Sequence, residues 1–229
     1  EALRSGALGL GIVLHSLMAF VPGLPWLVND SQTSTMAWVP IYWIHLFRMV
    51  LFMLLAGYFG RMVLHRRGAG AYLKDRLLRI GLPLVGFWPI AVATLIVLAV
   101  VNVVVRDVTP AEAPNLDGVP ELFLVFSPGH LWFLLVLLEC VLITVAVRAV
   151  ALRLLGAERC ARTAASIGRL LSTPAGVAIV AVPYVACLLL QGTTIEGIIA
   201  PQTVIPSAPA LTAYLSAFLA GWFLHAHTD

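Results

Sequence analysis

Four ionisable residues stand inside long apolar stretches of this sequence: His15, His45, Arg48 and Glu139. Such residues are costly at membrane depth, so a functional role is the default hypothesis for them. A neutral histidine in an apolar site can take a proton from a hydroxyl and act as a general base. An arginine can hold a carboxylate or a phosphate, or stabilise an oxyanion. These residue types suit acid–base chemistry on a hydroxyl and also proton-coupled transport, and spacing alone does not choose between the two.

The spacing of the residues indicates which of them share a helix face. Arg4 precedes His15 by eleven positions, which returns to nearly the same face about 16 Å further along a helix. That separation is too long for direct contact between the two along one straight helix. His45 and Arg48 are three positions apart and also share a face. We expect the intramembrane ionisable residues to lie at a similar depth and to face one another or a wet cavity rather than lipid.

Each of these residues also has a structural explanation. His15 can be satisfied by a hydrogen bond between helices. Arg48 can serve as the counter-ion of Glu139, because buried charges need partners whether or not chemistry follows. For Glu139 the structural role is favoured over a catalytic one, and His130 can simply begin a helix at the outer membrane interface.

The composition places these residues in a membrane protein. Hydrophobic residues make up 61% of the 229 residues, charged residues 11%, and the mean hydropathy is +0.98; soluble proteins average about 25% charged. We therefore predict an all-α polytopic membrane protein. About six transmembrane helices are expected, over residues 3–21, 38–59, 82–105, 130–150, 174–190 and 208–224.

The Lys and Arg residues alternate between the predicted loops. The second and fourth loops contain nearly all of them, so the positive-inside rule places these loops and the N-terminus in the cytoplasm. This orientation explains the net charge of +3 better than nucleic-acid binding, which we exclude. Residues 72–80 combine apolar positions at helical spacing with basic ones, which predicts a basic helix on an anionic membrane surface between spans two and three. A solvated loop explains residues 66–70 equally well.

The cysteines indicate no metal or disulfide framework. Cys140, Cys160 and Cys187 have no C-x-x-C spacing and no cluster of His or acidic partners. No metal ligands and no permanently bound cofactor are expected.

Four stretches, in order, resemble the acyltransferase-3 family of integral membrane O-acyltransferases. They are ALRSGALGLGIVLHS, HLFRMVLFMLLAGYF, YLKDRLLRIGLPL and GHLWFLLVLLE, which together cover most of residues 1–140. Each motif is weak alone, and their combination is specific. The AGYF ending, where many relatives have a serine before the glycine, moves the likeness toward the glucan-modifying branch.

The resemblance implies an enzyme and assigns roles to residues. It implies transfer of an acyl group, succinyl in that branch, from cytoplasmic acyl-CoA to hydroxyls of an extracytoplasmic glycan, a periplasmic glucan, at the bacterial inner membrane. The catalytic residues would be His15, as general base or acyl relay, and Arg48. The substrate-binding residues would be Arg4, His45, His130 and Glu139. The coenzyme A phosphates would meet Arg66, Arg67, Arg76 and Arg79, although orienting the protein explains these cations as well.

The resemblance also sets the expected architecture and partners. Family members have about ten spans, so residues 1–229 are expected to form a single transmembrane acyltransferase domain that is incomplete at its C-terminal end. The expected partners are membrane lipids, acyl-CoA, the glycan acceptor and periplasmic glucan-synthesis proteins. The rival hypothesis is a transporter or flippase that uses a layer of His15, Arg48 and Glu139, and the absence of an inverted repeat argues against it.

Overall fold

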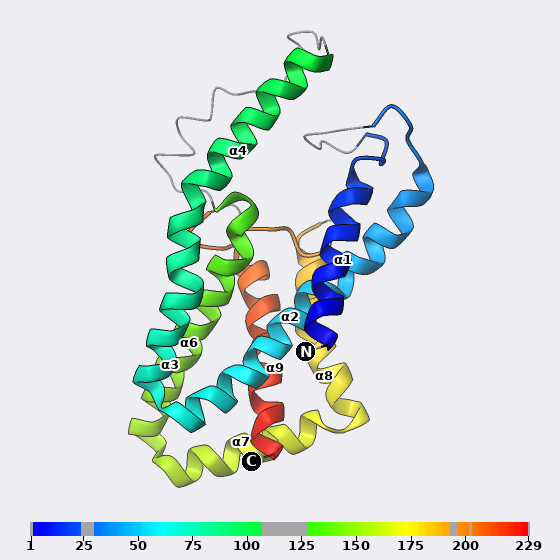
Figure 1. The fold of residues 1–229 in the computed structure, drawn as a ribbon. Helices are drawn as coiled ribbons and strands as arrows, with labels where there is room; N and C mark the ends of the chain where they lie inside the picture. Colours follow the sequence, from blue (N-terminus) through cyan, green and yellow to red (C-terminus); the bar gives the residue numbers. More distant parts are fainter. Residues whose placement is uncertain (1, 24–29, 107–127, 193–196, 202, 229) are drawn as a thin grey trace.

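The chain folds into a bundle of helices in a computed structural model, which describes residues 2–23, 30–106, 128–192, 197–201 and 203–228 (Figure 1). Throughout these ranges the regular secondary structure is helical. The long helices are α1 (Ala2–Met18), α2 (Trp38–Arg67), α4 (Leu82–Arg106), α6 (Trp132–Leu155), α8 (Pro174–Leu190) and α9 (Ala208–Thr228). The prediction of an all-helical protein is confirmed for the described residues.

Three helices in the described part of the chain are long and apolar enough to cross a membrane. They are Thr35–Arg67, Ala69–Leu98 and Trp132–Leu155, and a fourth crossing results if one bent helix pair counts as a single span. These helices agree with a membrane protein. The prediction of about six spans stays a prediction.

The basic segment after α2 is helical and continuous with the helix that follows. Gly68 separates α2 from α3 (Ala69–Arg76) in a conformation with φ of 80°, which favours glycine. A π-helical turn, Leu77–Gly81, then leads from α3 directly into α4. The predicted basic helix is therefore the first part of a longer helix, and its place on a membrane surface stays a prediction.

A sharp bend separates α7 (Ala157–Leu171) from α8. The two axes differ by 97° across a short break. Thr173 caps α8, because its hydroxyl accepts a hydrogen bond from the Gly176 N–H at 3.3 Å, and Pro174 occupies the first helical position. Helix α7 consequently runs across one end of the bundle, the lower end in Figure 1.

Helix α9 forms the centre of the bundle, packed against α2, α7 and α8 (Figure 1). Its crossing with α2 depends on a reciprocal pair of glycines. A Cβ atom at Gly57 of α2 would overlap the carbonyl of Phe218, and a Cβ atom at Gly221 of α9 would overlap the carbonyl of Leu54. Small residues allow this close approach of helix backbones, which is a common form of packing in membranes.

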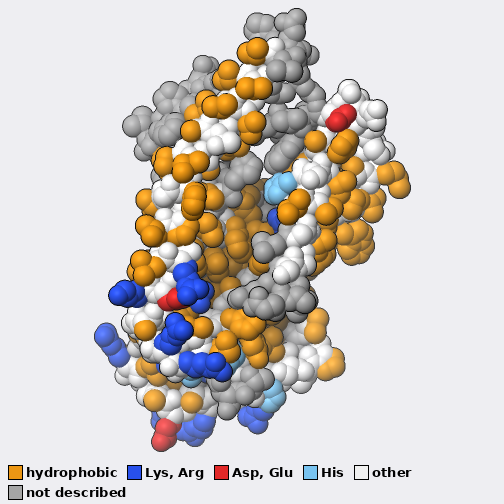
Figure 2. All heavy atoms as spheres, viewed as in Figure 1, with side chains coloured by type: hydrophobic (Ala, Val, Ile, Leu, Met, Phe, Trp, Pro, Cys, Tyr) orange, Lys and Arg blue, Asp and Glu red, His pale blue; other side chains and the backbone are white. Residues whose placement is uncertain are grey.

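The outer faces of the helices are apolar and exposed. Val104 of α4 is 74% exposed and Leu154 of α6 is 77% exposed. Large apolar surfaces of this kind are rare on soluble monomers and are expected against lipid. Lys and Arg side chains gather instead at the lower end of the molecule (Figure 2).

The segment after α8 is tied into the bundle by hydrogen bonds. The Gln191 side chain donates to the Gly197 carbonyl and accepts from the Ile199 N–H at 3.0 Å. The Tyr214 hydroxyl of α9 donates to the Ile198 carbonyl at 3.4 Å. Both Gly197 and Ile198 are buried, and Gly197 lies next to the His45 carbonyl of α2. This segment therefore connects α2, α8 and α9.

The glycine crossing predicts a stability loss for Gly57→Ala. The added methyl must push α9 away from α2, so the free energy of unfolding should fall by about 1–3 kcal/mol, as for other overpacked cores. Chemical denaturation in detergent measures the change. Gly86→Ala on α4 is the matched control, because nothing lies within 4 Å of a Cβ at that position. Equal stability of the two variants would contradict the crossing.

The hydrogen bond of Tyr214 predicts opposite results for two Tyr→Phe changes. Tyr214→Phe removes the donor to a buried carbonyl and should lower the free energy of unfolding by about 1 kcal/mol. Tyr72→Phe removes a hydroxyl that is buried without a hydrogen-bond partner, so it should be neutral or slightly stabilising. The same denaturation experiment compares them, and a larger loss for Tyr72→Phe would refute this assignment.

Candidate active site

The Arg48 side chain reaches from α2 to α1 and lies against Gly11. A Cβ atom at Gly11 would stand 2.6 Å from Arg48 Nη1 and 3.6 Å from its Cζ. Gly11 and His15 are one helical turn apart, so they share the face of α1 that meets α2. The guanidinium of Arg48 is therefore placed on the face of α1 that also bears His15.

His15, His45 and Arg48 form a cluster between α1 and α2. The charge of Arg48 and the ring of His15 both act electrostatically on His45, so the three side chains lie near one another. His45 and Arg48 are half-buried, whereas His15 is exposed. Figure 2 shows this face of the molecule hollowed between α4 and α1, with histidine and basic side chains at the rim on the α1 side. The structure thus brings together three of the four intramembrane residues that the sequence singled out.

Glu139 belongs to a different environment. It lies on α6 next to the buried Cys140, and its Oε2 atom is buried without a hydrogen-bond partner. No hydrogen bond or ion pair among the described residues joins Glu139 to Arg48. In the described part of the chain, the structure thus shows no ion pair for the alternative in which Arg48 is the counter-ion of Glu139, and a binding role for Glu139 stays a prediction.

Two tyrosines extend the cluster toward the centre of the bundle. Tyr214 of α9 is buried and acts electrostatically on Arg48, and Tyr184 of α8 acts on Tyr214. Neither tyrosine is predictable from the sequence, since a lone tyrosine in an apolar helix is indistinguishable from an ordinary core residue. Gly11 was missed as well, although three glycines within six positions of α1 indicate a close helix contact.

Two of the predicted substrate-binding residues are placed by their backbone alone. Arg4 lies in α1, seven positions before Gly11, and His130 lies in the short 3₁₀ turn Gly129–Leu131 that precedes α6. Their side chains lie outside the described part of the structure. The roles predicted for both residues, and the predicted absence of contact between Arg4 and His15, stay predictions.

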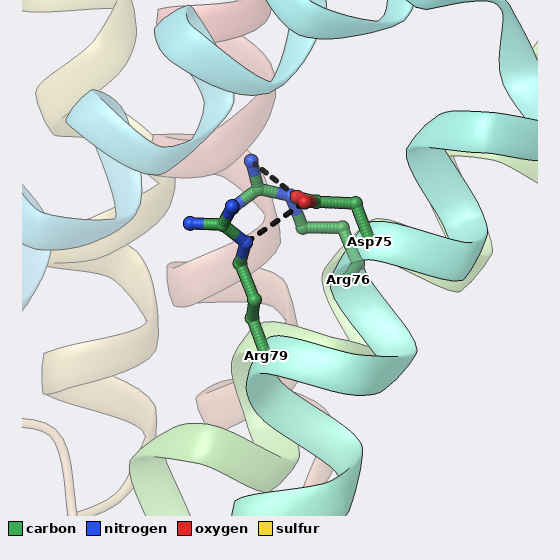
Figure 3. A network of polar contacts seen from close by, with 3 residues as sticks. All are labelled: Asp75, Arg76 and Arg79. Carbon is green, nitrogen blue, oxygen red and sulfur yellow. Dashed lines mark hydrogen bonds and ion pairs between the residues drawn. The ribbon is translucent and has the colours of Figure 1, made fainter.

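The four predicted phosphate-binding cations fall into two pairs, one at the end of α2 and one at the end of α3 and in the π-helical turn after it. Arg66 and Arg67 are exposed at the end of α2. Asp75 holds the other two: Arg79 Nε donates to its Oδ1 at 2.8 Å, and Arg76 Nη2 lies 3.5 Å from its Oδ2 (Figure 3). A single carboxylate shared by two guanidinium groups leaves this end of the molecule positively charged.

Arg76 is the most constrained of these cations. Its guanidinium carbon lies 5.3 Å from the centre of the Tyr72 ring, a cation–π contact, and the group is half-buried. The other three cations are exposed. Within the described ranges, no three His, Cys, Asp or Glu side chains are placed to hold a metal ion together.

The cluster of His15, His45 and Arg48 has the components of a transfer site. A histidine that is kept neutral by a nearby cation can accept a proton from a hydroxyl. A guanidinium beside it can bind an anionic group or stabilise developing negative charge. The arrangement can therefore both activate a hydroxyl and hold the group that the hydroxyl attacks.

Comparison with known proteins agrees with this chemistry. Glucans biosynthesis protein C from Shigella boydii serotype 4 and from Escherichia coli strain K12 are each 27% identical to the chain over 145 residues, which covers 60% of this chain and 35% of the relative. The chain thus spans about a third of the length of these curated relatives. No solved structure matches. The acyltransferase domain profile of the acyltransferase-3 family matches residues 1–229, and the chain therefore belongs to this family of membrane acyltransferases.

Proposed function

We propose that the protein transfers a succinyl group from cytoplasmic acyl-CoA to hydroxyls of an extracytoplasmic glycan, a glucan of the periplasm. The membership in the acyltransferase family supports the reaction class. The printed name of its relatives, glucans biosynthesis protein C, supports the glucan acceptor. The observation that carries the proposal is the gathering of His15, His45 and Arg48 between α1 and α2.

The proposed step moves one proton and one acyl group. His15 takes the proton from the acceptor hydroxyl, and the hydroxyl oxygen forms an ester bond with the acyl carbon of the donor. The carbon–sulfur bond of the thioester breaks, and the departing coenzyme A thiolate takes up the proton. Arg48 binds the acyl group during this step, and His45 lies beside both residues.

The orientation and the donor path follow from charge. With the basic end in the cytoplasm, the N-terminus is cytoplasmic and the chain crosses the inner membrane about six times. Arg66, Arg67, Arg76 and Arg79 then face the compartment that supplies acyl-CoA, where they bind its phosphates. Arg4 lines the path from that side, while His130 and Glu139 meet the acceptor. Periplasmic glucan-synthesis proteins present the acceptor on the other side.

The proposal predicts that His15→Ala abolishes glycan acylation while the protein still inserts into the membrane. Loss of a general base typically lowers a rate by about 10²- to 10⁴-fold. Mass spectrometry of periplasmic glycans from cells with and without the gene, and with each variant, reports the acyl mass and the acceptor together.

His227→Ala is the matched control for this experiment, because His227 is exposed in the last turn of α9. It should leave acylation unchanged. Retained acylation in the His15→Ala cells would refute the assigned role. Glycan or substrate uptake into proteoliposomes without acyl-CoA would instead support the transporter hypothesis.

A further inference from the structure

Gly11 differs from the other glycines of α1 in what surrounds it. A Cβ atom at Gly11 would meet the guanidinium of Arg48 and no other described atom within 4 Å. At Gly6 and Gly9 of the same helix a Cβ atom would meet nothing within 4 Å. Among the described residues, the missing side chain at Gly11 therefore makes room for the guanidinium of Arg48.

Arg48 has no acidic partner among the described residues. Its Nε atom is buried without a hydrogen-bond partner. The described acids are engaged or placed elsewhere: Asp75 pairs with Arg76 and Arg79, Asp30 accepts the backbone N–H of Gln32, Glu139 makes no described contact with Arg48, and Glu158 is exposed in the first turn of α7.

A guanidinium stays protonated in proteins, and holding its charge inside a membrane is costly without an anion beside it. The hydroxyl of Tyr214 supplies a dipole near Arg48 but no charge. Among the described residues, no negative group lies beside Arg48, and a ligand can supply one.

We propose that Gly11 leaves the space in which Arg48 binds the free carboxylate of a dicarboxylic acyl group. Gly11 and Arg48, called the carboxylate site below, thereby select the donor. The inference rests on the proposed succinyl transfer and names the residues that recognise the succinyl group. A succinyl group has a carboxylate at the end opposite its thioester, which matches the planar fork of a guanidinium. An acetyl or butyryl group leaves the guanidinium without an anion.

The carboxylate site also explains how the carboxylate and the thioester of one acyl group can both be bound. Gly11 and His15 are one turn apart, about 5.4 Å along the helix axis. The carboxylate held at Gly11 therefore places the other end of a four-carbon acyl group within reach of His15. Arg48 binds and positions the donor, and Gly11 acts through Arg48 as a positioning residue.

The test compares two donors that differ only at the far end of a four-carbon chain. Detergent-solubilised full-length protein receives succinyl-CoA or butyryl-CoA with a glucan oligosaccharide as acceptor, and mass spectrometry of the product gives kcat/KM for each donor. The kcat/KM of the wild-type protein should be about 10- to 100-fold higher for succinyl-CoA than for butyryl-CoA. This is the factor expected for a hydrogen bond to a charged group. Arg48→Gln should bring this ratio close to one.

Gly11→Ala is the decisive variant, because its methyl displaces the flexible end of a side chain and leaves the helix backbones in place. It should lower the succinyl-to-butyryl ratio by about 10-fold. Gly9→Ala adds the same methyl in open space on the same helix and should keep the wild-type ratio. In the Arg48→Gln background, Gly11→Ala should change the ratio no further, since it acts through Arg48.

Two results would contradict the proposal that Gly11 and Arg48 form a carboxylate site. If Gly11→Ala or Arg48→Gln lowers kcat/KM for both donors by the same factor, Gly11 and Arg48 do not recognise the carboxylate. The proposed acyl transfer itself would not be contradicted by this result. If Gly11→Ala lowers the ratio further in the Arg48→Gln background, Gly11 does not act through Arg48. Failure of the wild-type protein to transfer either donor would refute the proposed function itself, and this outcome is visible before any variant is compared.

Discussion

The close crossing of α2 and α9 is the contact on which the rest of the molecule depends. Gly57 and Gly221 bring the two backbones together, and α9 in turn packs against α7 and α8. Helix α2 bears His45 and Arg48 on one side of this crossing and the basic residues of its last turn on the other. Because one rigid helix holds both groups, their separation along its axis is set by helix geometry.

Lipid cannot drive helices together through the hydrophobic effect, so this bundle uses shape and a few polar contacts. Gly57 and Gly221 allow the close approach of the helix backbones. The polar contacts come from Gln191 and Tyr214, which tie the segment after α8 to its neighbours, and from Asp75, which links Arg76 and Arg79 at the basic end. His15, His45 and Arg48 therefore all lie on helices of this bundle, with His45 and Arg48 half-buried.

The sequence predicted the positions of the helices well, since each apolar run that it marked is helical in the structure. It also selected His15, His45 and Arg48, because an ionisable residue in an apolar run is conspicuous without any knowledge of the fold. It did not predict Gly11, Tyr184 or Tyr214, whose importance arises from contacts between helices. The sequence also could not decide whether Arg48 is the counter-ion of Glu139, because similar depth in two helices does not determine which faces meet. The continuity of α3 with α4 was also missed, because the basic composition of the segment resembles a surface helix that ends before the span.

The length of α2 bears on the donor that we propose. Arg48 and Arg66 are eighteen residues apart on one helix, a separation of about 27 Å. A donor that touches both ends must be long, with its phosphates far from its reactive carbonyl. Acyl-CoA has this form, because an extended pantetheine arm separates its thioester from its phosphates. A small phosphorylated donor would leave either the basic end or the histidine cluster without a partner. The long helix α2 is therefore compatible with the proposed acyl-CoA donor, whose phosphates would meet the basic end while its acyl group lies near Arg48 and the two histidines.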